Sequence, residues 1–131
     1  MASKDHLSDY QFSYRNDGPQ YSFSGYFNDS EYDEEMGYDL YTHAVTAKHK
    51  PTNRIVGEML YQSGGPLFQI DVDEDHQRRG VAEGMVKHGI KVHEAADKIG
   101  AFIPRPQRAS HETDEGVEFG ESMVKKGLFE E

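Results

Sequence analysis

The sequence contains no cysteine and little positive charge, and each shortage excludes a class of function. Without cysteine there is no disulfide bond, no thiolate metal site and no cysteine nucleophile. Lys and Arg total 14 against 24 Asp and Glu, so the formal net charge is -10 at pH 7. A protein that neutralises nucleic-acid phosphates or binds an anionic membrane needs the opposite balance. We therefore expect neither nucleic acid nor membrane among its partners.

Long apolar runs are also missing. No stretch approaches the roughly 20 apolar residues that span a bilayer, and the opening residues MASKDHLSDY lack the apolar centre of a signal peptide. These features predict a cytoplasmic protein. The length of 131 residues fits one compact domain, and no repeat or low-complexity linker divides it. We expect a single domain over residues 1–131, whose first 37 residues form an N-terminal part rich in acidic residues and tyrosine.

Alternation of apolar and polar residues with period two predicts strands in the first half of the chain. Two aromatic stretches surround the turn signal N-D-G-P at residues 16–19, which predicts a hairpin with an aromatic face. The acidic residues 28–37 that follow are expected to form a loop or a short irregular helix. A second antiparallel hairpin and a further strand come next. The predicted strands are residues 10–14, 21–27, 40–47, 54–61 and 67–72.

After Gly80 the apolar spacing becomes helical and predicts a helix that continues to about Ile99, where Gly100 stops it. Gly84 and Gly89 weaken this prediction by roughly 1 kcal/mol each relative to alanine. The expected apolar positions of this helix are Val81, Met85, Ile90, His93 and Ala95 or Ala96.

A short strand at Ala101–Ile103 is expected next, ended by two prolines. A last helix is expected from a Thr113 cap to Gly127, with acids in its first turn and apolar residues at Val117, Phe119, Met123 and Val124. The order of these elements predicts an α+β fold, in which helices pack on a sheet.

Two patterns suggest metal sites and fail on closer inspection. Asp71, Asp73 and Asp75 have the D-x-D-x-D spacing of a calcium loop, but the required glycine and glutamate are replaced by His76 and Ala82. The stretch H-E-A-A-D at residues 93–97 differs by one residue from a zinc-protease motif, and no third ligand is marked. We therefore expect no metal site.

The segment from Gln77 to Ala82 instead favours phosphate binding. It follows a predicted strand and opens a predicted helix, and Gly80 allows the tight turn that leaves successive N–H groups unpaired. Those N–H groups and the positive end of the helix dipole form a site for a pyrophosphate. Arg78 or Arg79 would add positive charge at the rim, and small Ala82 would let a ligand approach.

These residues resemble a known family. V-D-E-D-H-Q-R-R-G-V-A at residues 72–82 is similar to the acetyl-CoA-binding motif Q/R-x-x-G-x-G/A of the GCN5-related N-acetyltransferase (GNAT) family, after a strand that ends in Val72. Glu74 replaces a usual proline. Residues 116–128 are similar to the family's second motif, a helix running into Gly-Phe, with Leu128 in place of Phe. The resemblance covers roughly residues 38–129 and is greatest to small bacterial and phage members.

The resemblance implies a GNAT-like fold, with a central mixed, mostly antiparallel sheet and helices packed on it, and acetyl-CoA as co-substrate. Its pantetheine would pair with the backbone of Ile70, Asp71 and Val72 where two strands splay apart. Arg105 and Arg108 are candidates for its 3′-phosphate. The pyrophosphate would contact the motif residues Gln77, Arg78, Arg79, Gly80, Val81 and Ala82. The family's two N-terminal helices would be replaced by the aromatic hairpin.

The resemblance also implies direct transfer of the acetyl group to a primary amine in a ternary complex. Candidates for the base that takes the amine proton are Glu58 and Asp71. The family often uses a tyrosine of the last helix to protonate the leaving thiolate, but Met123 stands at that position. This substitution leaves Tyr61, His111 or solvent as the proton donor, or no catalysis at all.

The acceptor and the partners follow from charge. An acidic N-terminal part would attract a cationic amine, either a small molecule or a protein lysine or N-terminus. The alternative is a catalytically silent GNAT-fold binding or inhibitor protein that acts through a protein partner, suggested by Met123 and the divergent first 37 residues. Exposed aromatic strand edges would also suit a homodimer.

Overall fold

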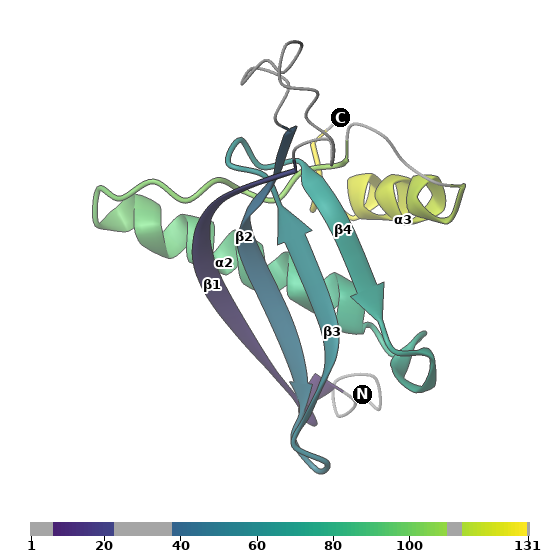
Figure 1. Ribbon diagram of the computed structural model, residues 1–131. Helices are drawn as coiled ribbons and strands as arrows, with labels where there is room; N and C mark the ends of the chain where they lie inside the picture. The colour runs from purple at the N-terminus through teal and green to yellow at the C-terminus, as the bar shows by residue number, and fades with distance from the viewer. Residues whose placement is uncertain (1–6, 23–37, 110–113, 131) are drawn as a thin grey trace, which may run out of the picture.

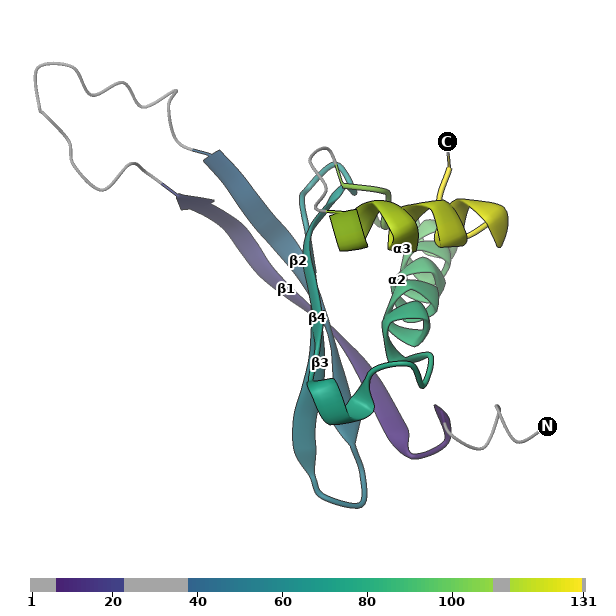
Figure 2. The same cartoon turned by 90° about the vertical axis from the view of Figure 1, so that its right-hand side faces the viewer.

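The structure is a computed structural model that describes residues 7–22, 38–109 and 114–130. Four antiparallel strands lie in the order β1-β2-β3-β4, so each strand pairs with the next along the chain (Figure 1). Helices α2 and α3 pack on the same side of this sheet (Figure 2). The predicted α+β class is confirmed. The elements are β1 Tyr10–Ser22, β2 Tyr38–His49, β3 Arg54–Tyr61, β4 Leu67–Val72, the short 3-10 helix η2 Glu74–His76, α2 Val81–Lys98 and α3 Asp114–Lys125.

The first strand corrects the prediction of an N-terminal hairpin. Residues 10–22 form one strand that pairs with β2 instead of folding back on itself, with Tyr14 opposite Val45 and Tyr21 opposite Asp39. The N-D-G-P signal appears as an irregularity in this ladder between Asn16 and Gln20. A long partner strand thus outweighs a local turn preference, since it provides more cross-strand pairs than a short hairpin could. Residues 23–37, which include the predicted acidic loop, lie outside the described residues.

The next three strands confirm the prediction and divide residues between two faces of the sheet. Met59 lies opposite Val45 on one side and Ile70 on the other, and Tyr61 lies opposite His43. Because side chains alternate along a strand, these residues share the face that α2 covers. The buried core on this face includes Val45, Ala47, Met59, Tyr61, Leu67, Val81, Met85, Val86, Ile90, Met123 and Phe129.

Helix α2 sits close to the sheet because two of its buried residues are glycines. A Cβ atom at Gly84 would lie 2.5 Å from Cζ of Phe12 on β1, and one at Gly89 would lie 3.3 Å from Cε of Met59 on β3 and 2.6 Å from Cγ of Pro106 after the helix. The residues that lower the helix propensity are therefore the ones that allow the close approach.

The strand predicted at Ala101–Ile103 is wrong. Residues 101–106 have no regular secondary structure, and Phe102 is 78% exposed. Pro104 and Pro106 have no N–H to donate, which limits ladder formation here. One parallel bridge forms further on, where Gln107 accepts a bond of 2.9 Å from the N–H of Leu67 and donates one of 2.9 Å to the oxygen of Gly65.

Both described helices end as predicted. Gly100 and Gly127 each adopt φ +76°, and each helix closes with a bond that spans six residues. The N–H of Ala101 donates to the oxygen of Ala96 at 2.9 Å, and the N–H of Leu128 donates to the oxygen of Met123 at 2.8 Å. These are Schellman closures, which satisfy carbonyl groups that the helix leaves free. The predicted cap Thr113 lies outside the described residues.

Candidate functional site

The turn between β4 and α2 is built by its own backbone and one side chain. The N–H of Asp73 donates to the oxygen of Val56 at 2.8 Å, which continues the β3–β4 pairing. The side-chain amide of Gln77 donates to the oxygen of Val72 at 2.9 Å and so closes the loop between them. Arg78 and Gly80 then adopt left-handed conformations, with φ +64° and φ +83°. The predicted motif residues therefore form a tight, internally fixed turn.

The first turn of α2 leaves its donors without a side-chain cap. Gly80 is the N-cap residue and has no side chain to bond them. The first helical bond runs from the N–H of Gly84 to the oxygen of Gly80 at 2.8 Å, so the N–H groups of residues 81–83 have no acceptor within the helix. Left-handed residues alternating with others turn successive amides toward one side, and the helix dipole adds positive potential there. This arrangement suits an anion.

Glu83 carries the acidic group of this first turn and is neutralised by two lysines. Its carboxylate accepts a hydrogen bond from Lys126, the residue after α3, and lies 3.0 Å from Nζ of Lys87. The hydrogen bond from Lys126 is the main reason that the pKa of Glu83 is lowered, with Lys87 contributing. The contact of Glu83 with Lys126 therefore joins the chain after α3 to the start of α2, and the two lysines offset the negative charge of Glu83.

Strand β4 has one edge that no described strand covers. Its inner edge pairs with β3, and its outer edge meets the chain at the bridge between Pro66 and Gln107. From there β4 runs to the turn as one of the two edge strands of the sheet (Figure 1). Ile70 and Val72 are half-buried on the helix side. The backbone that the resemblance assigns to pantetheine thus lies beside the assigned pyrophosphate site.

The two candidate bases are brought together by the register of the sheet. Glu58 on β3 is the direct cross-strand partner of Asp71 on β4, on the face away from α2. Asp71 is exposed and accepts a hydrogen bond from the side-chain amide of Gln69. Glu58 is half-exposed, 3.8 Å from a guanidinium nitrogen of Arg15. Both carboxylates therefore lie at the solvent boundary.

Tyr61 lies on the other face and does not meet these carboxylates. It is fully buried and stacks on His43 with ring centroids 5.1 Å apart, while Nδ1 of His43 lies 2.6 Å from the hydroxyl of Tyr14. The Tyr61 hydroxyl has no hydrogen-bond partner among the described residues. Burial, followed by the nearby Tyr14, raises the pKa of Tyr61 far above its ordinary value. Tyr61 therefore stays neutral, and proton transfer from it to a thiolate is unfavourable.

The remaining candidates that the structure describes lie in α3 or next to it. The guanidinium of Arg105 donates to the oxygens of Gly127 and Leu128, both at 3.0 Å, and so caps the end of α3. Met123 is 2% exposed in the core. His111 lies outside the described residues. Arg108 lines an open cavity of about 700 Å³ between residues 107–109 and α3, together with Glu121, Val124, Lys125 and Glu130.

Sequence reasoning missed Glu83, Lys87 and Lys126 as neighbours of the candidate anion site. The Glu83–Lys87 pair has the i,i+4 spacing that neighbours on a helix show, so a signal existed for it. Lys126 lies 43 residues from Glu83 along the chain, and no local pattern connects the two.

Comparison of the chain with protein-family models and with curated proteins finds no match in either set. Among the helices that the structure describes, none is long and apolar enough to cross a membrane. The fold and the turn define an α+β domain with an uncapped helix start beside a free strand edge. The resemblance to the GNAT family therefore rests on the motif residues alone.

Proposed function

We propose that the protein is an N-acetyltransferase that moves the acetyl group of acetyl-CoA to a primary amine. The observation that carries the proposal is the β4–α2 turn, in which Gly80 places uncapped amides at the helix start. The pyrophosphate of coenzyme A is a compact anion, and backbone amides at a helix N-terminus bind such groups through both hydrogen bonds and the dipole. Exposed Arg78 and Arg79 add positive charge at the rim.

The position of the turn at the end of β4 supports the same proposal. Pantetheine contains two amide groups, which pair with backbone donors and acceptors in the way that an added strand does. The outer edge of β4 offers such groups between Gln107 and the turn. A cofactor whose phosphates contact Gly80 would therefore extend along the outer edge of β4, with its pantetheine beside the backbone of residues 70–72.

The proposed reaction is a direct transfer. The neutral amine attacks the thioester carbonyl, the C–N bond forms, the C–S bond breaks, and one proton passes from nitrogen to sulfur. Holding both reactants in place is worth about 7–11 kcal/mol of the barrier. Asp71 is the preferred base, because it lies on the strand that would hold the cofactor and faces solvent, with Glu58 beside it. The raised pKa of Tyr61 favours solvent as the proton source for the thiolate.

The overall charge supports a cationic acceptor. The net charge of -10 would attract a small polyamine-like molecule or a protein lysine or N-terminus. No position of the described site selects between these two classes, so the acceptor is proposed as a primary amine. We propose that the protein acts in the cytoplasm.

The test begins with the cofactor alone. Acetyl-CoA at 1 mM is expected to raise the melting temperature, since a ligand that binds only the folded state stabilises it by mass action. Thiol release from acetyl-CoA is then measured with a panel of polyamines, aminoglycosides and lysine-containing peptides. The absence of both the thermal shift and thiol release would refute the proposal.

A second candidate is a silent GNAT-fold binding or inhibitor protein that acts on a protein partner. The burial of Met123 and of neutral Tyr61 favours it, because neither supplies an acid for the leaving group. A thermal shift with acetyl-CoA but no thiol release with any amine would support this candidate. Thiol release with any amine would exclude it.

A further inference from the structure

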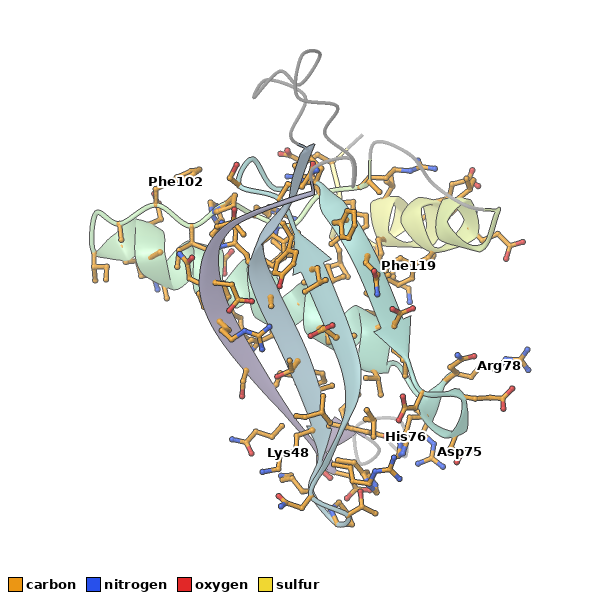
Figure 3. All side chains as sticks on the ribbon, in the orientation of Figure 1. Lys48, Asp75, His76, Arg78, Phe102 and Phe119 are labelled. Atoms are coloured by element: carbon orange, nitrogen blue, oxygen red, sulfur yellow. The ribbon has the colours of Figure 1, made fainter. Side chains whose placement is uncertain are left out.

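Three segments of the chain meet at the end of the sheet that lies beside the turn. Tyr10 comes from the start of β1, His49 from the end of β2 and His76 from η2. The ring centroids of the two histidines are 4.7 Å apart, and Tyr10 lies 5.4 Å from His49 and 5.7 Å from His76. Figure 3 labels His76 at this lower end of the sheet, next to Asp75. The proposed acetyl transfer uses none of these rings.

Each histidine is oriented through the same ring nitrogen. Nδ1 of His76 lies 2.7 Å from the hydroxyl of Tyr10, and Nδ1 of His49 lies 2.8 Å from Oγ1 of Thr52. Nε2 is therefore the nitrogen that each ring leaves for another contact. Tyr10 is 5% exposed, so its hydroxyl is a fixed anchor. Histidines that bind metals show this arrangement, in which a polar group on the second nitrogen sets the ring orientation.

The separation of the rings suits a shared metal ion. A metal–nitrogen bond of about 2.0–2.1 Å places the ion roughly 3.2 Å from the ring centroid. Two imidazoles that bind one ion at an angle of about 90–110° then have centroids roughly 4.5–5.2 Å apart. The observed 4.7 Å between His49 and His76 lies within this range. The rings are tilted by 56° and so are not stacked face to face.

We propose that Nε2 of His49 and Nε2 of His76 form a binding site for a divalent transition metal ion such as Zn²⁺, Ni²⁺ or Cu²⁺. Imidazole nitrogen is a preferred ligand of these ions. Within the described ranges, no three His, Asp or Glu side chains form a metal-binding group, so water fills the other positions. The ion would join η2 to the β2–β3 turn. The inference is independent of acetyl-CoA binding.

The test is calorimetric titration of the full chain with ZnCl₂ and NiCl₂, at neutral pH in a buffer that does not bind metals. We expect one site, and at least a tenfold loss of affinity in His49→Asn and in His76→Asn. The matched control is His93→Asn, because His93 is also half-buried and bonded through Nδ1, to the oxygen of Ile103 at 2.7 Å, but has no histidine neighbour among the described residues. It should change affinity less than twofold. Tyr10→Phe keeps both ligands and should weaken binding by a smaller factor than either ligand variant.

A measurement on the unaltered protein makes the result independent of how the variants fold. Substoichiometric Cu²⁺ is expected to broaden the ring signals of His49 and His76 in the NMR spectrum before those of His43 and His93. Absence of a site tighter than 1 mM overturns the proposal. So does unchanged affinity in either ligand variant that circular dichroism shows to be folded, or equal broadening of all four histidines.

Discussion

The two ends of α2 both contain an exposed glycine in the left-handed conformation, yet they treat their free polar groups in opposite ways. At the C-terminal end, Gly100 has φ +76°, and the N–H groups of Gly100 and Ala101 bond back to Asp97 and Ala96. At the N-terminal end, Gly80 has φ +83° and no side chain that could bond the first amides. The C-terminal end thus has hydrogen bonds to its last carbonyl groups, whereas the first N–H groups at the N-terminal end have no capping side chain.

This difference separates what folding requires from what binding requires. A Ser, Asp or Asn at the N-cap of a helix is better than Gly by a few tenths of a kcal/mol, and α2 does without it. Steric crowding does not require glycine at this position, because the nearest atom to an added Cβ at Gly80 is Cδ2 of Leu7, at 3.9 Å. The backbone angle and the open amides are therefore the features that Gly80 provides.

The largest expected effect comes from placing a side chain at each end in turn. Gly80→Glu and Gly100→Glu should each lose about 1–2 kcal/mol of folding free energy, since both force an L-residue into the left-handed region. Only Gly80→Glu should also lose acetyl-CoA, with a Kd at least about 100-fold higher, equivalent to about 2.7 kcal/mol. Thermal denaturation measures the loss of stability in each variant, and titration calorimetry measures the Kd for acetyl-CoA. Equal binding by the two variants would show that the open end is not the cofactor site.

The middle of the same helix tests whether its other glycines serve packing instead. Gly84→Ala should lower the free energy of unfolding by about 1–3 kcal/mol, because the new methyl group meets the Phe12 ring. An exposed helical glycine would gain about 1 kcal/mol from the same change. Ala95→Gly, on the exposed side of α2, is the control and should lose about 1 kcal/mol. Urea denaturation gives the values, and stabilisation by Gly84→Ala would contradict the close packing.

The core also contains a polar group without a hydrogen-bond partner among the described residues, the hydroxyl of Tyr61. Tyr61→Phe removes a buried hydroxyl that has no partner among the described residues, so stability should stay constant or rise by up to about 1 kcal/mol. The rate of acetyl transfer should change less than twofold, because the raised pKa makes Tyr61 a poor acid. Chemical denaturation and a steady-state assay measure these. A tenfold loss of rate without loss of stability would make Tyr61 the proton donor.

The smallest effect concerns the charge beside the open end. Because the pKa of Glu83 is lowered in the fold, its contribution is present above the ordinary value of 4.5 and is lost as the pH falls through the lowered value. Lys126→Met should therefore cost about 0.5 kcal/mol at pH 7 and almost nothing at pH 2. Denaturation curves from pH 2 to 7 measure this. The control is Lys125→Met, because Lys125 is next to Lys126 and is also exposed. An equal cost in both variants at pH 7 would remove the assigned role of Lys126.

Local patterns were enough to predict most of the fold. Period-two alternation located β2, β3 and β4, and the helix-stop glycines Gly100 and Gly127 ended α2 and α3 where the structure ends them. The pairing of β1 could not be found this way, because the choice between a short hairpin and a long partner strand is made by residues far away. The prediction of a strand at residues 101–103 is wrong for a similar reason, because an apolar stretch forms a β-ladder only where another strand pairs with it.

The position of the turn at Gly80 and its tight backbone were predicted from the sequence. The arrangement of Glu58, Tyr61 and Asp71 relative to one another was not. Glu58 and Tyr61 are three residues apart on one strand, so alternation alone directs them to opposite faces. That signal was present in the sequence. The pairing of Glu58 with Asp71 depends on the β3–β4 register, which includes an irregularity next to Tyr61. The link from Lys126 to Glu83 depends on how α3 packs, which only tertiary structure determines.

The sequential order of the four strands has a consequence for how the chain folds. Every described strand pairs with its neighbour in sequence, so the sheet can assemble by successive hairpin closures with short loops along β2, β3 and β4. Chains rich in such local pairings reach the native state faster than those that need distant strands to meet. The bridge between Gln107 and Pro66, and the contact of Lys126 with Glu83, join more distant segments. The free edge of β4 would therefore form early, before α3 docks beside it.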